Sequence, residues 1–179
     1  MHMQKNIVFT ITGPDRIGLV ERVSRIVADH AGNIEASRMA HLGGEFAMLM
    51  LVKITEEQMK DLTRQFEELK TEGYKVTVTV TGDEDPAKYR GWLPYEIEVT
   101  GADHEGIIHR IASFLSRSGF NIEKINTDTV IAPVSGTALF TMDAIFLVPA
   151  DKPFAGWHRS LQALGEELNV EIEVAPYKG

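Results

Sequence analysis

The sequence predicts an α+β fold in which one unit of strands and helices occurs twice in tandem. The motif TGPDRIGLVER at residues 12–22 recurs as TGADHEGIIHR at residues 100–110. Stretches that alternate apolar and polar residues surround both motifs, and such alternation is typical of strands with one solvated face. Because the same elements follow in the same order twice, we expect two antiparallel sheets, each with its helices on one face.

Strands are predicted where apolar and polar residues alternate. These segments are residues 7–12, 74–81, 95–100 and 170–174. The strands of a doubly wound parallel sheet are covered on both faces and would be apolar throughout. The alternation therefore favours antiparallel or mixed sheets.

Helices are predicted where apolar residues recur at helical spacing. Two helices follow the repeated motif and are expected to stop at Gly32 and Gly119, because glycine commonly ends a helix. Two more are expected over residues 55–72 and 154–168. The inward positions expected in the first pair are Ile17, Val20, Val23, Val27 and Ala31, and Ile108, Ile111, Phe114, Leu115 and Ser118.

Hairpins are predicted between the helices. The first covers residues 34–54 with a turn at Gly43-Gly44, and the second covers residues 122–148 with a longer turn through Pro133 and Gly136. Each half then has the order βαββαβ, which is the ferredoxin-like order. We expect domains at residues 1–82 and 95–179, joined by a linker at 83–94 that is rich in charge, Gly and Pro.

The strand at residues 46–54 is apolar on both faces, although the sheet of a single such unit should have one wet face. The second face is expected to pack against the other repeat or another subunit. A homodimer is therefore expected, with partial cover by loops as the alternative.

Composition and charge exclude several functions. The formal net charge is −8 and no cluster of Lys and Arg is present, which argues against direct binding of nucleic acid. No cysteine is present, so disulfides, thiolate catalysis and Cys-ligated zinc are excluded. No apolar run is long enough to span a membrane, and the N-terminus does not resemble a secretory signal. A cytoplasmic protein is expected.

The repeated loop lies where a strand leads into a helix. The first turn of a helix leaves N–H groups unpaired and carries partial positive charge, so it attracts a carboxylate or phosphate. Asp15 and Asp103 are expected to cap the helices, and Gly18 and Gly106 to allow close approach of a ligand or a backbone. The alternative is a purely structural role, because a duplicated fold also duplicates its caps.

Three catalytic or nucleotide motifs fail. Gly13 and Gly18 have the spacing of a P-loop, but Leu19-Val20 replaces its Lys and Ser/Thr, and neither loop has the dinucleotide pattern GxGxxG. The sequence HEGIIH at residues 104–109 separates its histidines by five residues, about 140° around a helix, instead of the four that zinc requires. No metal, cofactor or catalytic residue is expected; a hydrolase centred on His104, Glu105 and His109 is kept as a third alternative.

These residues resemble ACT domains, small ferredoxin-like modules that bind amino acids and regulate metabolism. The resemblance rests on TGxDxxG after the first strand and on NIE opening the second, and it covers about residues 6–82 and 95–176. A tandem pair without a catalytic domain is similar to the glycine cleavage system transcriptional repressor family. That resemblance implies glycine or a similar amino acid as effector, and action through a protein partner instead of direct DNA binding.

The resemblance also implies a ligand site between the first loop of one module and the start of the second strand of a neighbouring module. The implied residues of the first module are Asp15, Arg16, Ile17, Gly18, Leu19, Asn33 and Ile34. Those of the second module are Asp103, His104, Glu105, Gly106, Ile107, Asn121 and Ile122. The loops differ at Arg16/His104 and Ile17/Glu105, and the second is more negative, so a carboxylate should prefer the first.

The sequence therefore predicts a non-enzymatic regulatory protein that binds an amino acid. A structural or interaction module without a small ligand remains the competing interpretation. A tandem ACT pair can also precede a catalytic domain, so a regulatory subunit of an amino-acid metabolic enzyme is a further alternative.

Overall fold

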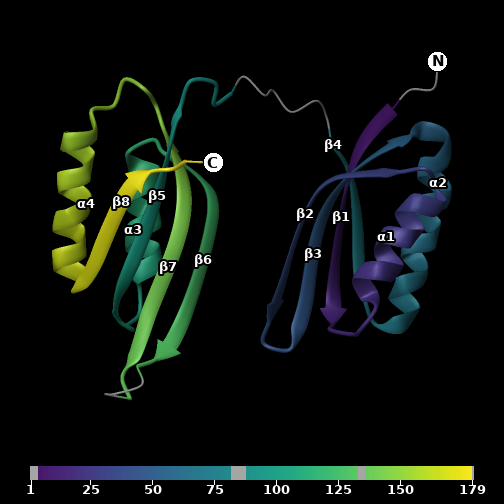
Figure 1. The fold of residues 1–179 in the computed structure, drawn as a ribbon, viewed down its shortest axis with the longest axis horizontal. Coiled ribbons are helices and arrows are strands. Elements are labelled where there is room, and N and C mark those ends of the chain that lie inside the picture. The colour runs from purple at the N-terminus through teal and green to yellow at the C-terminus, as the bar shows by residue number, and fades with distance from the viewer. Residues whose placement is uncertain (1–3, 82–87, 133–135, 179) are drawn as a thin grey trace. The chain divides into compact units, whose positions relative to one another are not determined.

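The computed structural model describes residues 4–81, 88–132 and 136–178. The chain forms two compact units, Met1–Glu84 and Asp85–Gly179. In each unit two α-helices cover one face of a four-stranded sheet and leave the other face open (Figure 1). The α+β fold with two ferredoxin-like units is therefore confirmed.

The first unit contains β1 (Gln4–Pro14), α1 (Leu19–Asp29), β2 (Asn33–Leu42), β3 (Glu45–Thr55), α2 (Glu56–Glu68), the 3₁₀ turn η1 (Leu69–Glu72) and β4 (Lys75–Thr81). The strand order is β2-β3-β1-β4, and every neighbouring pair is antiparallel. Since β1 and β2 both run opposite to β3, they are parallel to each other, and α1 makes the crossover between them.

The second unit repeats this topology. It contains β5 (Leu93–Ala102), α3 (Ile107–Arg117), β6 (Asn121–Ile131), β7 (Ala138–Val148), α4 (Phe154–Leu168) and β8 (Val170–Pro176), in the sheet order β6-β7-β5-β8. Strand β5 begins two residues before the expected boundary at 95. The expected linker lies partly, and the turn at 133–135 wholly, outside the described residues.

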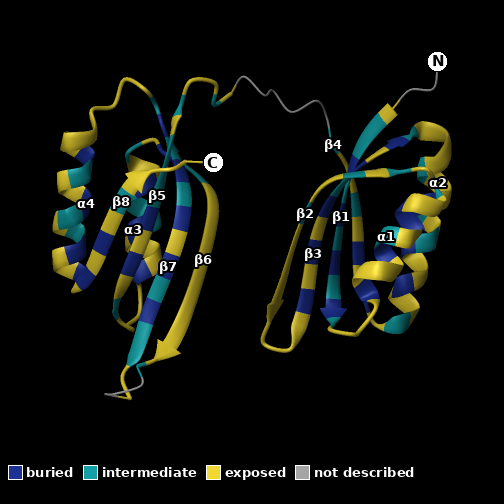
Figure 2. Cartoon of the chain, in the orientation of Figure 1, coloured by how far each residue is buried: buried dark blue, intermediate teal, exposed yellow. Residues whose placement is uncertain are grey.

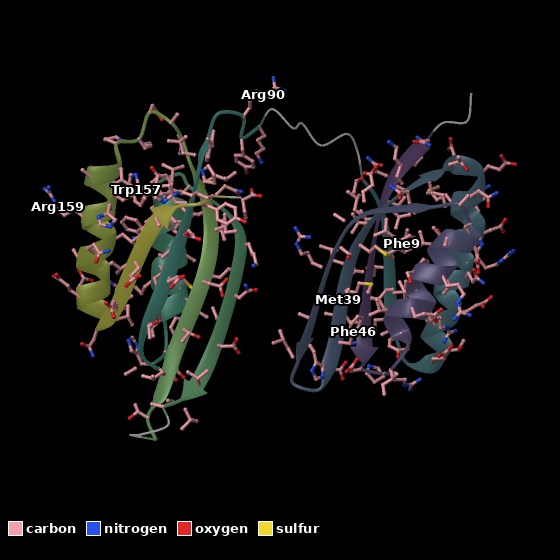
Figure 3. The ribbon with its side chains drawn as sticks, viewed as in Figure 1. Phe9, Met39, Phe46, Arg90, Trp157 and Arg159 are labelled. Atoms are coloured by element: carbon pink, nitrogen blue, oxygen red, sulfur yellow. The ribbon has the colours of Figure 1, made fainter. Side chains whose placement is uncertain are left out.

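Each unit has its own hydrophobic core between the sheet and the helices (Figure 2). In the first unit Phe9 and Phe46 point into this layer, and the ring of Phe9 lies 4.2 Å from that of Phe66 in α2 (Figure 3). In the second unit Trp157 of α4 packs among Tyr95, Phe120 and Phe146. The period-two alternation of the strands thus supplies the sheet half of each core.

The starts of α1 and α3 differ from the expectation. Their N-caps are Gly18 (φ 89°) and Gly106 (φ 91°), and neither helix has a side-chain cap. The prediction that Asp15 and Asp103 cap these helices was therefore wrong, because each lies three residues before the N-cap. A left-handed glycine, favoured because it has no Cβ, makes the turn into each helix.

This later start also changes which residues face inward. Leu19 and Ile107 are buried, whereas Ile17 is fully exposed in the turn before α1. Val20 and Ile108 are each 43% exposed, so placing these three inward was wrong. At the other ends, Gly119 (φ 78°) follows α3 as expected, but after α1 the left-handed residue is Ala31 (φ 53°) and not Gly32. Ala31 is exposed, so its inward placement was wrong too.

Candidate functional site

A cavity of about 570 Å³ opens at the start of α1 in the first unit. Four of the predicted site residues line it: Arg16, Ile17, Gly18 and Leu19. The rest of its wall comes from α1, from α2 and η1, and from Tyr74 beside β4. The repeated loop therefore borders a hollow between two helices.

The first turn of α1 borders this hollow through Leu19 and Glu21. The N–H of Leu19 donates to the carbonyl of Arg16 at 3.2 Å, and the first helical bond runs from Arg22 to Gly18 at 2.9 Å. Val20 and Glu21 occupy the first turn, where a helix leaves its N–H groups without intrahelical acceptors. No atom lies within 4 Å of the position that a Cβ on Gly18 would take, so this side of the loop is open.

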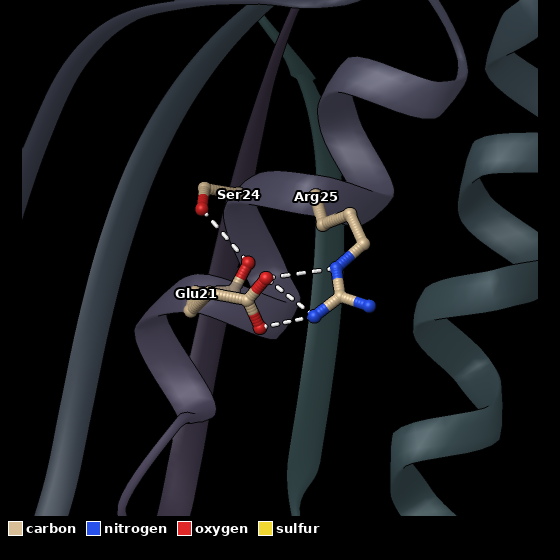
Figure 4. A network of polar contacts seen from close by, with 3 residues as sticks. All are labelled: Glu21, Ser24 and Arg25. Atoms are coloured by element: carbon tan, nitrogen blue, oxygen red, sulfur yellow. Dashed lines mark hydrogen bonds and ion pairs between the residues drawn. The ribbon is translucent and has the colours of Figure 1, made fainter.

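Most charges in the cavity wall are neutralised by a neighbour. Arg22 makes a two-pronged ion pair with Glu72, with both N–O distances at 2.6 Å. The hydrogen bond between them raises the pKa of Arg22 and lowers that of Glu72. Arg25 pairs with Glu21 in the same helix, and its Nε donates at 2.8 Å (Figure 4). The wall therefore contains few free cations.

Three charged residues of the wall, Arg16, Asp29 and Glu68, make no ion pair among the described residues, and Arg16 is the cation of the three. Its guanidinium lies over the ring of Tyr74, 5.6 Å from the ring centroid, and it makes no ion pair with any residue that the structure describes. A guanidinium can bind a carboxylate with two parallel hydrogen bonds. Arg16 is thus the cation that remains for an anion in this cavity.

Gln65 of α2 adds an acceptor to the same wall. Its Oε1 is buried, and no donor among residues 4–81, 88–132 and 136–178 satisfies it. An unsatisfied buried acceptor costs roughly 1–3 kcal/mol. A small rotation that turns the amide oxygen toward the cavity would let it accept a hydrogen bond from a ligand.

The start of β2, where Asn33 and Ile34 were expected to join the site, does not lie beside the cavity. Asn33 pairs with Lys53, which also pairs with Asn6 near the beginning of β1, whereas the loop follows the end of β1. Asn33 and Ile34 are therefore at the opposite end of the sheet from Arg16–Leu19, and only a second module could bring the two regions together. Asp15 precedes the residues that line the cavity.

In the second unit the corresponding polar side chains are engaged internally. Nε2 of His104 lies 2.8 Å from the carbonyl of Leu168, and Nδ1 lies 3.1 Å from that of Glu105. These contacts, led by the one to Leu168, raise the pKa of His104. Asn121 accepts a hydrogen bond from the hydroxyl of Tyr89 at 3.2 Å and donates to Glu123 at 2.7 Å.

The remaining predicted residues of this unit form no cluster with these two. Asp103 accepts a hydrogen bond from Thr129 at 3.4 Å, Ile107 is buried in the core, and Ile122 packs against it. Glu105 and Gly106 are exposed in the loop, with Gly106 as the N-cap of α3. Like Asn33 and its loop, Asn121 and the second loop lie at opposite ends of their sheet.

Sequence reasoning missed Gln65, Glu72 and Tyr74 of the first cavity. They lie about fifty residues after the loop, and only the packing of α1 on α2 brings them near it. One signal was available: Arg22 recurs as Arg110, and Arg110 also pairs with a distant acid, Glu167, at 2.5 Å.

The described residues also bear on whether the chain has a metal site or a membrane-spanning helix. The described residues contain no group of three or more His, Asp or Glu side chains that could hold a metal ion. In the part of the chain that the structure covers, no helix is long and apolar enough to cross a membrane.

Comparison with known proteins places the chain among relatives. The ACT domain family model matches residues 5–81. The glycine cleavage system transcriptional repressor of Escherichia coli (strain K12) is 28% identical over 178 residues, which are 97% of this chain and 92% of the relative. The UPF0237 protein of Methanopyrus kandleri is 37% identical over 73 residues, covering 41% of this chain and 80% of that protein.

A solved structure extends the likeness to both units. The crystal structure of an unknown protein from Galdieria sulphuraria has a TM-score of 0.81 and 28% identity, and the match covers 98% of this chain and all of that one. The family model matches the first unit, and the sequence relative and the solved structure each match nearly the whole chain. The first unit therefore matches the ACT domain family, and the chain over nearly its whole length is similar to a glycine cleavage system transcriptional repressor.

Proposed function

We propose that this protein is a non-catalytic regulator that binds a free amino acid in the cavity at the start of α1 and signals to a protein partner. The observation that carries the proposal is the cavity itself. It combines a helix N-terminus, an arginine that makes no ion pair with the described residues, and one unsatisfied buried acceptor.

These groups match the two charged ends of an amino acid. The α-carboxylate would accept hydrogen bonds from the N–H groups of the first turn of α1 and from the guanidinium of Arg16. The α-ammonium would donate to Oε1 of Gln65 once the amide turns toward the cavity. The volume of about 570 Å³ falls in the range usual for small-molecule sites and admits glycine or a larger amino acid.

We further propose that the two units are not equivalent and that the first binds the ligand. His104 replaces Arg16 in the second loop, and both of its ring nitrogens already face backbone carbonyls. Asn121 is likewise bound to Tyr89 and Glu123 within its own unit. A ligand at the second loop would have to displace these contacts, which lowers its affinity.

The regulatory part of the proposal rests on the relatives and on charge. A homologue over nearly the whole chain is named a glycine cleavage system transcriptional repressor. The net charge of −8 disfavours direct contact with phosphates, so a regulator of transcription with this charge would act through a protein. A ligand-free interaction module remains the competing function, and a subunit that regulates a metabolic enzyme fits the same ligand site.

Isothermal titration calorimetry of the full chain with glycine and then the other amino acids tests this proposal. We expect one site per chain. Arg16→Ala should weaken binding about tenfold or more, since a hydrogen bond to a charged group is worth about 1.5–3 kcal/mol. The matched control is Arg64→Ala, because Arg64 pairs with Asp61 on α2 and does not line the cavity.

Two outcomes would contradict the proposal. No heat of binding with any of the twenty amino acids would favour the ligand-free module. Two equal sites per chain, or a loss of affinity on His104→Ala as large as on Arg16→Ala, would show that the units are equivalent.

A further inference from the structure

The two sheets expose faces of opposite chemistry on the side away from their helices. We call these open face 1, in the first unit, and open face 2, in the second unit. The apolar residues of open face 1 are Val8, Ala36, Ala40, Ala47, Leu49 and Leu51, as their register opposite one another shows. Its central Leu49 is 48% exposed, so this apolar surface is unpartnered within the unit.

Open face 1 is also basic at its margins. On β2, Arg38 lies opposite Leu49, and on β4, Lys75 lies opposite Thr12. Lys53, near the end of β3, lies opposite Asn33 and makes an ion pair with Glu35 at 3.9 Å. Lys75 also lines a hollow of about 490 Å³ at one end of this face, together with Thr12, Ala40 and Ala47. The face therefore offers an apolar centre with a hollow at one end and with Arg38 and Lys75 as cations at its margins. Glu45 also lines the hollow, and Lys53 is already paired with Glu35.

Open face 2 is acidic. Glu98 on β5 lies directly opposite Asp143 on β7 and directly opposite Glu173 on β8, so three carboxylates form a row across the sheet. Like charges in directly opposite positions destabilise a sheet. The amide of Asn126 donates to Asp143 at 2.8 Å but adds no charge. Glu96, Glu171 and Asp128 share this face, with Lys124 as its cation.

The repeat makes the divergence explicit, because each position of one sheet has a counterpart in the other. One row of open face 1 contains Arg38, Leu49, Thr10 and Thr77. The equivalent row of open face 2 contains Asn126, Asp143, Glu98 and Glu173. In the next row Lys75 corresponds to Glu171, a reversal of charge. The same scaffold thus presents complementary surfaces.

We propose that open face 1 of one copy of this chain packs on open face 2 of a second copy, and that the reciprocal contact closes a two-fold symmetric dimer. The occupant of the acidic face is a cationic surface and not a metal, because no three carboxylates or histidines among the described residues are placed so that they could hold a metal ion together. Facing sheets of two protein layers commonly pack about 10 Å apart.

The area of the two contacts is sufficient for such a dimer. Four strands spaced about 4.8 Å apart, with about seven residues each at about 3.3 Å, give a face of roughly 450 Å². Two reciprocal contacts bury four faces, about 1,800 Å² in total, which lies within the range of specific interfaces. The apolar centre of face 1 would meet Ile145 and Leu147 of face 2, which are half-buried in the unit alone.

Sedimentation velocity of the full chain at several protein concentrations tests the dimer. We expect Leu49→Glu to raise the dissociation constant at least tenfold. Met39→Glu is the matched control, since Met39 is 50% exposed on the same sheet but on the side of the helices (Figure 3). Raising the salt concentration should weaken the dimer, because exposed charges at its margin become screened. Circular dichroism verifies that each variant is folded.

Charge reversal distinguishes this pairing from other dimers. One variant carries Arg38→Glu and Lys75→Glu, and the other carries Glu98→Lys and Glu173→Lys. Each alone should be monomeric where the native chain is dimeric, and a mixture of the two should form a heterodimer because every contact is again between opposite charges. A native chain that stays monomeric, a Leu49→Glu variant that dimerises normally, or a face 2 variant that dimerises normally would overturn the proposal.

Discussion

Single residues of the repeated motif divide into structural and ligand-facing positions. Arg22 and Arg110 recur because each joins the first helix of its unit to an acid at or near the end of the second. Both pairs are largely exposed, and such pairs contribute about 0.2–1 kcal/mol each. Arg16 and His104 occupy equivalent positions but diverge, because Arg16 borders the cavity without an ion pair whereas both ring nitrogens of His104 face backbone carbonyls.

His104 gives a prediction about pH at this scale. Both of its ring nitrogens face carbonyl oxygens, and only the protonated imidazole can donate from both. Its pKa is therefore raised above the ordinary value, chiefly by the contact with Leu168. The protonated contact stabilises the fold fully below the unfolded-state pKa, and this stabilisation is lost as the pH rises through the folded-state pKa.

We accordingly expect His104→Gln to reduce the gain in stability that the native chain shows when the pH falls from about 8 to about 6. Urea unfolding at fixed pH values measures the effect, and an NMR titration of the ring protons gives the pKa of His104 directly. A titration midpoint at or below about 6.5 would contradict the prediction.

At the scale of elements, the existence of strands and helices followed from periodicity, but the start of α1 did not. The period-two segments at 7–12 and 95–100 lie inside β1 and β5. The turn into each helix depends on a left-handed glycine, and the sequence offered Asp15 as an equally plausible cap. Backbone conformation at one residue thus moved the helix start to Leu19 and put Ile17 into solvent.

The candidate site could be predicted only on its loop side. Residues 16–19 follow from the local rule that a helix N-terminus attracts anions. Gln65 and Tyr74 could not be predicted, because they reach the cavity through the packing of α2 and β4, which no local pattern encodes. The engagement of Asn121 by Tyr89 was hidden for the same reason, since Tyr89 belongs to the segment expected to be a linker.

The close approach of β1 to the turn before β4 gives a prediction about stability. A Cβ on Gly13 would lie 2.7 Å from Cδ1 and 3.2 Å from Cα of Tyr74. Gly13→Ala should therefore destabilise the first unit by about 1–3 kcal/mol, as overpacking usually does.

Gly156→Ala is the control, because Gly156 lies in α4 with no atom near its Cβ position. Alanine there should be neutral or stabilising by up to about 1 kcal/mol. Urea unfolding measures the stability of both variants. If Gly13→Ala is as stable as Gly156→Ala, the ring of Tyr74 moves aside for the added methyl group without loss of stability.

At the scale of the whole molecule, duplication has produced two units that share a fold and differ in surface chemistry. The buried residues form two separate clusters, Ile7–Val76 in the first unit and Ile97–Ile172 in the second. With independent cores, one unit can keep an open cavity beside its loop while the other uses the equivalent side chains in its own contacts. In the proposed dimer, the negative charge of the acidic row on open face 2 is balanced by the cations on open face 1 of the second copy and not by residues of the second unit.

Separate cores predict that each unit folds alone when residues 1–84 and 85–179 are produced as two chains. Domains of this size bury about 60–65% of their unfolded surface, enough for a marginally stable fold. Each fragment should unfold cooperatively, and its backbone amide NMR signals should overlay those of the full chain away from open faces 1 and 2. Shifts restricted to these faces would be expected, because each fragment alone lacks the complementary face with which its own face pairs in the dimer. Broad, poorly dispersed spectra from either fragment would mean that its core is completed by the other unit.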